Sequence, residues 1–409
     1  MNTASTTVPA TITLGAALGP WECIVVGAGP AGAATSLRLA RGGVRVLLVD
    51  RGFMPRGKVC GCCLSPAALG ELAQLALPGF RAGAVVPLRL DTLALSYGGS
   101  TARVAFRGGG VLSRETLDAG IVEAAVAAGV DWLPGVDVVS VKTRDGEPVS
   151  VTMRSAADGT VATIGATRCV LATGLADRVR GATEEHAIEA RRGPGTPGKR
   201  CLIGVGTALP ADCVDLPPGE LRMTVGRRGY CGLVRLEEGR IDVAAAIDRA
   251  ALREGGGATQ ALLAVLGRTS IAVGPRLAEA LRAARFTATP PLTRRSPPSS
   301  EGGRILRVGD AAAYVEPFTG EGIGWALAGA RIAANTILEG AGVASVGEAY
   351  AGAHRRHFVA PHARCRRVTS WLQSPALVSA AVASARIAPG IAARIVPLVT
   401  GAGGRGGRP

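Results

Sequence analysis

Residues 21–50, WECIVVGAGPAGAATSLRLARGGVRVLLVD, decide the fold. An apolar strand over 22–26 leads into the glycine-rich turn 27–32, and a helical stretch over 33–41 leads into a second strand over 44–49 that ends at Asp50. This order predicts a βαβ unit that binds a dinucleotide, with the pyrophosphate at the helix N-terminus. The alternative is a glycine-rich turn of another α/β protein, but the two strands, the helix and the terminal acid together favour the dinucleotide.

Each glycine of this turn has a physical task. Gly27 permits the tight turn, Gly29 lets the backbone approach the pyrophosphate, and Gly32 lets the helix pack close to the strand. Asp50 is expected to accept hydrogen bonds from a ribose hydroxyl. The other predicted contacts to the dinucleotide are Ala28, Pro30, Ala31 and Arg51.

A second motif stands far downstream. A strand over 304–308 precedes Gly309-Asp310-Ala311-Ala312, and the turn EPFTGEGI over 316–323 precedes a helical stretch over 324–338. This pattern resembles the second flavin-binding motif of the p-hydroxybenzoate-hydroxylase-type flavoproteins. The resemblance implies FAD, with Gly309 and Asp310 holding its ribityl chain. It also implies a turn that presents backbone N–H groups to the flavin pyrimidine, with contacts from Pro317, Gly320, Gly322 and Ile323.

Two further stretches fit the same superfamily. In LSRETLD, residues 112–118, the resemblance implies that Arg114 reaches the phosphate–ribityl region of FAD. VLATG, residues 170–174, matches the strand and turn that close the FAD domain, but Thr173-Gly174 replaces the Asp-Gly of many NADPH-using relatives. No second dinucleotide motif follows, so NAD(P)H is expected to bind only transiently, or a redox partner protein supplies the electrons.

Within the superfamily, three segments resemble the geranylgeranyl-reductase/FixC-like branch. They are PRGKVCG over 55–61, LSP over 64–66 and GEGI over 320–323. The Tyr-x-Trp-x-Phe-Pro segment of prenyl reductases is replaced by YCGLVR over 230–235, and the Trp-x-Trp-x-Ile-Pro hallmark of flavin halogenases is absent. No C-terminal cysteine cluster is present for an iron–sulfur centre.

Four residues are candidates for positions near the flavin: Cys60, Lys58, Pro317 and Phe318. The Cys60 thiol either positions the substrate or packs as a small apolar group. Lys58 is either an electrostatic partner of the flavin or a solvated side chain. Cys62 and Cys63 could pair with Cys60, although adjacent cysteines rarely meet disulfide geometry. No metal site is expected, since arginines surround the pair His354 and His357.

These motifs predict an α/β fold in which a Rossmann-like FAD-binding domain carries an inserted antiparallel substrate sheet. The FAD-binding domain is expected over 21–70, 100–185 and 300–345, and the substrate domain over 71–99 and 186–299. A loose tail is expected over 1–20, a basic and apolar helical segment over 346–409, and loops over 191–199 and 290–303.

Composition narrows the class of protein further. The 46 Lys and Arg against 31 Asp and Glu give a net charge of +15, yet lysine occurs only at Lys58, Lys142 and Lys199. Without basic tracts interleaved with aromatic residues, we expect no nucleic-acid binding. With 47% hydrophobic residues the chain can bury a core. The nine cysteines and the absence of an export signal predict a cytoplasmic protein.

The apolar segment 374–400, broken by Pro375, Pro389 and Pro397, fits three roles. It could lie on a membrane surface, roof a tunnel for an apolar substrate, or only pack on the domain. The sequence leaves these alternatives open.

The functional expectation is an FAD-dependent oxidoreductase. Its substrate is expected to be a hydrophobic small molecule such as a polyketide or alkylphenol, and hydroxylation is favoured because the reductase and halogenase hallmarks are missing. The first alternative is reduction of an isoprenoid or lipid C=C bond. The others are a flavin electron carrier at the membrane surface and a binding protein that has lost its flavin.

Overall fold

The computed structural model describes most of the chain. The described residues are 7–60, 62–83, 85–144, 147–176, 179, 201–254, 256–267, 273–295, 297–316, 318, 320–340 and 342–399. The predicted contact Pro317 and the predicted loop over 191–199 lie outside them.

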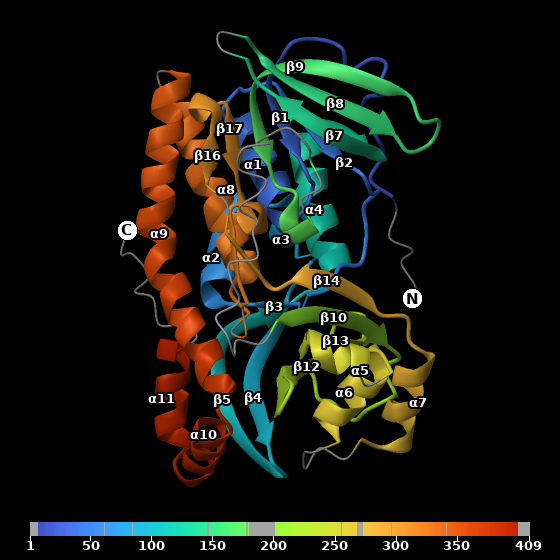
Figure 1. The fold of residues 1–409 in the computed structure, drawn as a ribbon, viewed down its shortest axis with the longest axis vertical. Coiled ribbons are helices and arrows are strands. Elements are labelled where there is room, and N and C mark those ends of the chain that lie inside the picture. Colours follow the sequence, from blue (N-terminus) through green and yellow to red (C-terminus); the bar gives the residue numbers. More distant parts are fainter. Residues whose placement is uncertain are drawn as a thin grey trace.

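A mainly parallel sheet forms the centre of the first lobe (Figure 1). Its strand order is β16-β17-β9-β1-β2-β6, and β7 and β8 extend it from β9. All five residues of β2 are buried, which is typical of a parallel strand covered on both faces. The strands are β1 (Trp21–Val26), β2 (Val46–Asp50), β6 (Asp131–Pro134), β7 (Val136–Lys142), β8 (Val149–Ser155), β9 (Val161–Leu171), β16 (Ser299–Ser300) and β17 (Ile305–Arg307).

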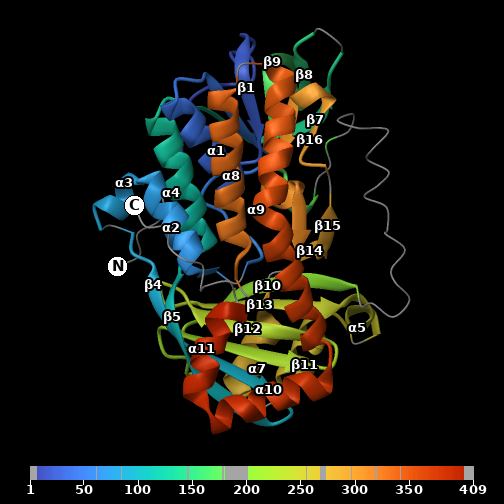
Figure 2. The ribbon, with the colours of Figure 1, turned by 90° about the vertical axis from the view of Figure 1, so that its left-hand side faces the viewer.

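Three helices pack side by side on one face of this sheet (Figure 2): α1 (Pro30–Arg41), α4 (Arg114–Ala127) and α8 (Gly322–Glu339). Their small and branched side chains form one apolar core with the sheet, including Ala33, Leu37, Ile121, Ala330 and Ala334. Alanine on the facing helices permits close approach, which brings the N-termini of α1 and α8 to the same edge of the sheet. The short helices α2 (Pro66–Leu75) and α3 (Pro78–Arg81) follow the segment that leaves β2.

The second sheet forms the other lobe, in the order β14-β10-β13-β12-β11-β4-β5-β3. On β13, Ile241, Val243 and Ile247 pack with α6 and α7, so Asp242 and Ala244 face the opposite side. The elements are β3 (Cys63–Leu64), β4 (Leu88–Tyr97), β5 (Ser100–Val111), β10 (Leu202–Leu209), β11 (Glu220–Gly226), β12 (Gly229–Arg235), β13 (Ile241–Asp248), β14 (Thr287–Pro291), α5 (Arg249–Glu254), α6 (Ala258–Leu266) and α7 (Pro275–Ala283).

The C-terminal part is helical. The long α9 (Val343–Leu372) runs along both lobes (Figures 1 and 2), and α10 (Pro375–Ile387) and α11 (Pro389–Val399) cover β4 and β5. The small strands β15 (Thr293–Arg295) and β18 (Ala313–Val315) pair with each other. Short 3₁₀ turns span Gly174–Ala176, Glu301–Gly303 and Gly309–Ala311.

The predicted fold class is confirmed, but three boundaries differ. Residues 100–111 form β5, which pairs with β4 in the second sheet, although we expected them in the FAD domain. Residues 7–20 are not a loose tail, because Val8 and Leu14 are buried and the Val8 N–H donates to the Met54 carbonyl. The predicted loop over 290–303 contains β15 and β16, short pairings that tolerate nearby prolines because they lie at edges.

Candidate flavin and substrate site

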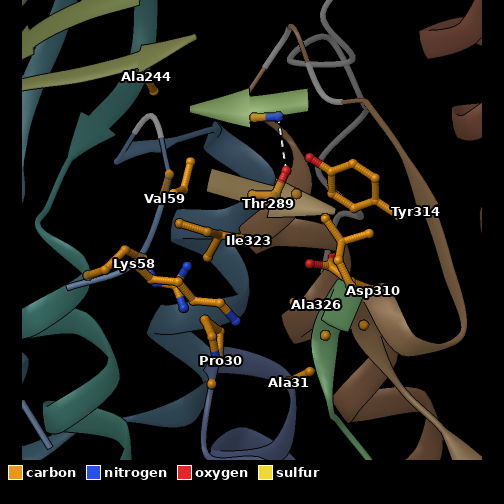
Figure 3. Close-up of a pocket in the computed structure, with 18 of the residues that line it drawn as sticks. Pro30, Ala31, Lys58, Val59, Ala244, Thr289, Asp310, Tyr314, Ile323 and Ala326 are labelled. Carbon is orange, nitrogen blue, oxygen red and sulfur yellow. Dashed lines mark hydrogen bonds between the residues drawn. The ribbon is translucent and has the colours of Figure 1, made fainter. Parts of the chain in front are cut away.

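A cavity of about 530 Å³ lies between the two sheets, and residues of both flavin motifs line it (Figure 3). The first lobe contributes the turn between β1 and α1, the end of β2, and the segment from Gly309 to the start of α8. The second lobe contributes the opposite wall. The predicted residues on its lining are Gly27, Gly29, Pro30, Ala31, Asp50, Arg51, Lys58, Cys60, Arg114, Gly309, Asp310, Phe318, Gly320, Gly322 and Ile323.

The turn before α1 leaves no room for side chains at two of its glycines. Gly27 has φ +102°, and a Cβ there would lie 2.4 Å from the Ala172 carbonyl oxygen. A Cβ on Gly32 would lie 1.8 Å from the Gly27 oxygen. Around Gly29 there is space, and no side chain caps α1 at this residue. The helix therefore presents an uncapped N-terminus to the cavity, where it can bind a pyrophosphate.

Arg56, which the sequence argument missed, holds Asp50. The Asp50 Oδ1 atom accepts from the Gly52 N–H at 2.8 Å and its Oδ2 accepts from the Ala28 N–H at 2.7 Å. The Arg56 guanidinium donates to both oxygens, with 2.7 Å to Oδ2. These four donors fill the hydrogen-bonding capacity of a carboxylate, so Arg56 must move before Asp50 can bind a ribose hydroxyl.

The second motif places another uncapped helix N-terminus at the cavity. Gly309 has φ +60°, and a Cβ there would lie 2.9 Å from Ala31 Cβ, so the two motifs touch. Asp310 lines the cavity next to Gly309, and α8 begins at Gly322 without a side-chain cap. Two positive helix ends at one cavity fit the two electron-rich parts of FAD, its pyrophosphate and the N1–C2=O edge of its reduced ring. The residues present therefore fit FAD.

Two cations lie between these helix ends. Arg114 is buried and bound by Asp118 through contacts of 2.9 and 2.6 Å. The Lys58 side chain lines the cavity and keeps exposed surface there, although protein atoms surround it. Burial lowers the pKa of Lys58, and Arg114 lowers it further, while Asp310 raises it. Both expectations for Lys58, an electrostatic partner of the flavin and a solvated side chain, therefore stay predictions.

The cysteine segment borders the same cavity. The Cys62 N–H points at the Cys60 Sγ atom at 3.4 Å, and the Cys62 backbone has φ +51°. A hydrogen bond from the Cys62 side chain lowers the pKa of Cys60 to about 6, with help from Arg114 and against the effect of burial. Burial raises the pKa of Cys63. All nine cysteines are free, so Cys60 lies on the cavity lining as a thiol rather than in a disulfide.

The wall formed by the second sheet is mostly apolar. Its side chains include Leu90, Leu93, Phe106, Leu221, Met223 and Val234. Tyr230 contacts the predicted residue Phe318 edge-on, with ring centroids 4.9 Å apart, and both side chains line the cavity. Thr289 on β14 adds a hydroxyl group to this wall, and Tyr314 on β18 adds one to the cavity from outside the second sheet (Figure 3). A flat apolar molecule can therefore lie between this wall and the flavin position.

Asp242 is the second residue that sequence reasoning missed. It is 9% exposed and lines the cavity from β13 among apolar neighbours. Its signal in the sequence is a single acid in the otherwise apolar stretch IDVAAAI over 241–247. Arg56 gave no such signal, because an arginine in a loop after a strand is common.

Two kinds of feature are absent from the described residues. No three His, Cys, Asp or Glu side chains there gather closely enough to hold a metal ion. Across the same residues, no helix combines the length and the hydropathy needed to cross a bilayer.

Comparison with known proteins gives matches over both lobes. A family model described as pyridine nucleotide-disulphide oxidoreductase matches residues 21–193. A menaquinone reductase of Mycolicibacterium smegmatis is 26% identical over 392 residues, covering 87% of this chain and 85% of that protein. The solved structure of a geranylgeranyl bacteriochlorophyll reductase-like protein from Thermoplasma acidophilum covers 89% of this chain and 91% of its own, with TM-score 0.70 and 19% identity. A flavin-dependent brominase structure covers 94% of both chains, with TM-score 0.69 and 16% identity.

Proposed function

We propose a reaction for this FAD-dependent oxidoreductase. As the sequence motifs predicted, the chain is of the p-hydroxybenzoate-hydroxylase-type superfamily and is similar to its geranylgeranyl-reductase/FixC-like branch. The enzyme reduces a C=C bond in the isoprenoid part of a lipid-soluble substrate, of which a prenylated quinone is the best-supported class. Reduction of an isoprenoid or lipid C=C bond is the first of the alternatives that the sequence left open. It replaces hydroxylation as the favoured reaction.

The observation that carries the proposal is the apolar wall of Leu93, Leu221 and Met223 opposite the two uncapped helix N-termini. Such a wall can bury a hydrocarbon chain. The near full-length similarity to a protein named menaquinone reductase supports the quinone as the head of that chain.

The residues of the site have separate tasks in this reaction. When bound, FAD supplies hydride transfer. Arg114, fixed by Asp118, would hold the phosphate–ribityl region of FAD, and the uncapped N-terminus of α8 would stabilise negative charge at the flavin pyrimidine. The apolar wall excludes water from the double bond. The electrons come from NAD(P)H bound transiently or from a redox partner protein.

A direct test separates reduction from hydroxylation. The protein is loaded with FAD, reduced anaerobically, and mixed with menaquinone under nitrogen. We expect the flavin to reoxidise without oxygen and the product to carry two additional hydrogen atoms on its side chain. A product that forms only with oxygen, and that takes its new oxygen atom from labelled O₂, would overturn the proposal in favour of hydroxylation.

We also propose that the C-terminal helices contact a membrane surface. The residues Ile387, at the end of α10, and Ile391 and Ile395, on α11, are exposed, and we call them the C-terminal stripe. Arg386 and Arg394 flank them, and residues 349–409 contain nine arginines and no acid. An apolar stripe with basic neighbours suits a bilayer that contains anionic lipids.

A further inference from the structure

Asp242 is unusual among the cavity residues because of where it lies. The other acids on the cavity lining, Asp50, Asp137 and Asp310, belong to the FAD-binding lobe. Asp242 is the only acid that the described part of the second sheet contributes to the lining. Across the sheet its register partners are Val234 on β12 and Ala208 on β10. A carboxyl group is therefore held on the apolar wall where we place the substrate.

The surroundings of Asp242 do not pair it with a cation. Its Oδ2 atom is buried and has no hydrogen-bond partner, and the nearby Cys62 thiol favours its ionised form. Arg240, the nearest arginine along the chain, binds Glu238 and Glu115 instead. An unpaired carboxylate in such a place is costly, which favours the protonated form of Asp242.

The pKa of Asp242 agrees with this environment. Burial raises it well above the ordinary range, and the Cys60 thiolate raises it further. The titratable and charged groups that face Asp242 are Cys60, Cys62 and Cys63 from the cysteine segment, Cys231 from β12, Glu115 from α4, and Arg240. Of these, only Arg240 and the Cys62 thiol favour the ionised form.

We propose that Asp242 is the proton donor in the reduction, an inference that rests on the proposed function. One carbon of the double bond receives a hydride from reduced FAD while the other receives the proton of Asp242. The π bond and the Asp242 O–H bond break, and two C–H bonds form. The substrate is reduced by two electrons, the flavin is oxidised, and the Asp242 carboxylate regains a proton from water once the product leaves.

The first part of the test does not require a substrate. Infrared spectra at pH 7 are compared for the FAD-loaded wild type, Asp242→Asn and Asp248→Asn. Asp248 is the matched control, because it lies at the other end of β13, off the cavity lining. We expect the C=O band of a protonated carboxyl in the wild type and in Asp248→Asn, and its loss in Asp242→Asn. No difference between the wild type and Asp242→Asn would overturn the proposal.

The second part follows a single turnover with menaquinone in D₂O. Wild type should place two solvent deuteriums in each reduced bond, one through the exchangeable N–H of reduced FAD and one through Asp242. Asp242→Asn should keep its FAD and its reduction by dithionite, yet reoxidise with menaquinone roughly 100-fold more slowly or worse, as expected when a general acid is removed. Asp242→Asn that reoxidises at the wild-type rate would overturn the role of Asp242 alone. A wild type inert towards menaquinone and other isoprenoid lipids would instead overturn the proposed function, and the proton transfer with it.

Discussion

The carboxylate of Asp310 lies where the two flavin motifs meet, beside Gly309 and near the Lys58 ammonium. We predict that Asp310→Ala weakens FAD binding about tenfold or more, because a hydrogen bond to a charged group is worth roughly 1.5–3 kcal/mol. Titration of the apoprotein with FAD, followed by flavin fluorescence, measures the dissociation constant. Asp212→Ala removes an exposed carboxylate and serves as the control. Equal affinity of both variants would contradict the assignment of Asp310.

The ionisation of the Cys60 thiol is expected to give a pH-dependent ultraviolet signal. Its pKa of about 6 lies below the ordinary thiol value because the Cys62 side chain and Arg114 stabilise the thiolate. Because this pKa is lower in the folded than in the unfolded protein, the Cys60 thiolate increases the free energy of unfolding above the unfolded-state pKa. This contribution is lost as the pH falls through the folded-state pKa of about 6. Ultraviolet thiolate absorbance should therefore show a step near pH 6.

Variants identify the origin of this step. Cys60→Ser should remove it, and Cys62→Ala should move it to higher pH because the hydrogen bond to the thiolate is lost. Cys201→Ser, an exposed cysteine outside the cavity lining, should leave it in place. Persistence of the step in Cys60→Ser would assign it to another group.

At the scale of elements, the crossing of α1 over β1 depends on Gly32. A Cβ there would lie 1.8 Å from the Gly27 oxygen and 2.9 Å from the Cβ of Ala172, the residue after β9, so the backbone would have to shift to admit it. We predict that Gly32→Ala lowers the free energy of unfolding by several kcal/mol or prevents folding, as overpacking does in a tight site. Chemical denaturation followed by circular dichroism measures the change.

The control for this prediction lies in a neighbouring helix. Gly120 is inside α4, and a Cβ there would meet nothing within 4 Å. Gly120→Ala should therefore stabilise the protein by roughly 0.5–1 kcal/mol, since alanine loses less backbone entropy in a helix. Destabilisation by both substitutions to a similar degree would show that helix content, rather than the crossing, governs the result.

These elements also show how far the sequence could predict the site. The glycines at 27, 29 and 32 are local requirements of one turn, so the sequence alone predicted that turn and the helix after it. The hydrogen bonds from Arg56 to Asp50 and the position of Asp242 on the cavity lining depend on how the segments pack in three dimensions. The placement of residues 100–111 failed for the same reason, because the pairing of β5 with β4 is set by the sheet rather than by local pattern.

At the scale of the whole molecule, the two lobes enclose the cavity on one side of the second sheet, and α10 and α11 cover β4 and β5 (Figures 1 and 2). The inner face of α10 is used for this packing, since Val382 and Ala385 join Ala102 and Val104 in one cluster. The C-terminal stripe is therefore left on the outside, with Ile387 86% exposed.

We predict that the whole protein floats with vesicles containing phosphatidylserine, and less with neutral vesicles, because apolar insertion and arginine attraction act together. Replacing Ile387 and Ile391 with aspartate should abolish flotation while leaving FAD binding intact. Val161→Asp is the matched control, because Val161 is a 56% exposed apolar residue on β9, a strand of the first sheet rather than of the C-terminal helices. Flotation that survives the double substitution, or that Val161→Asp also abolishes, would move the contact away from the C-terminal stripe.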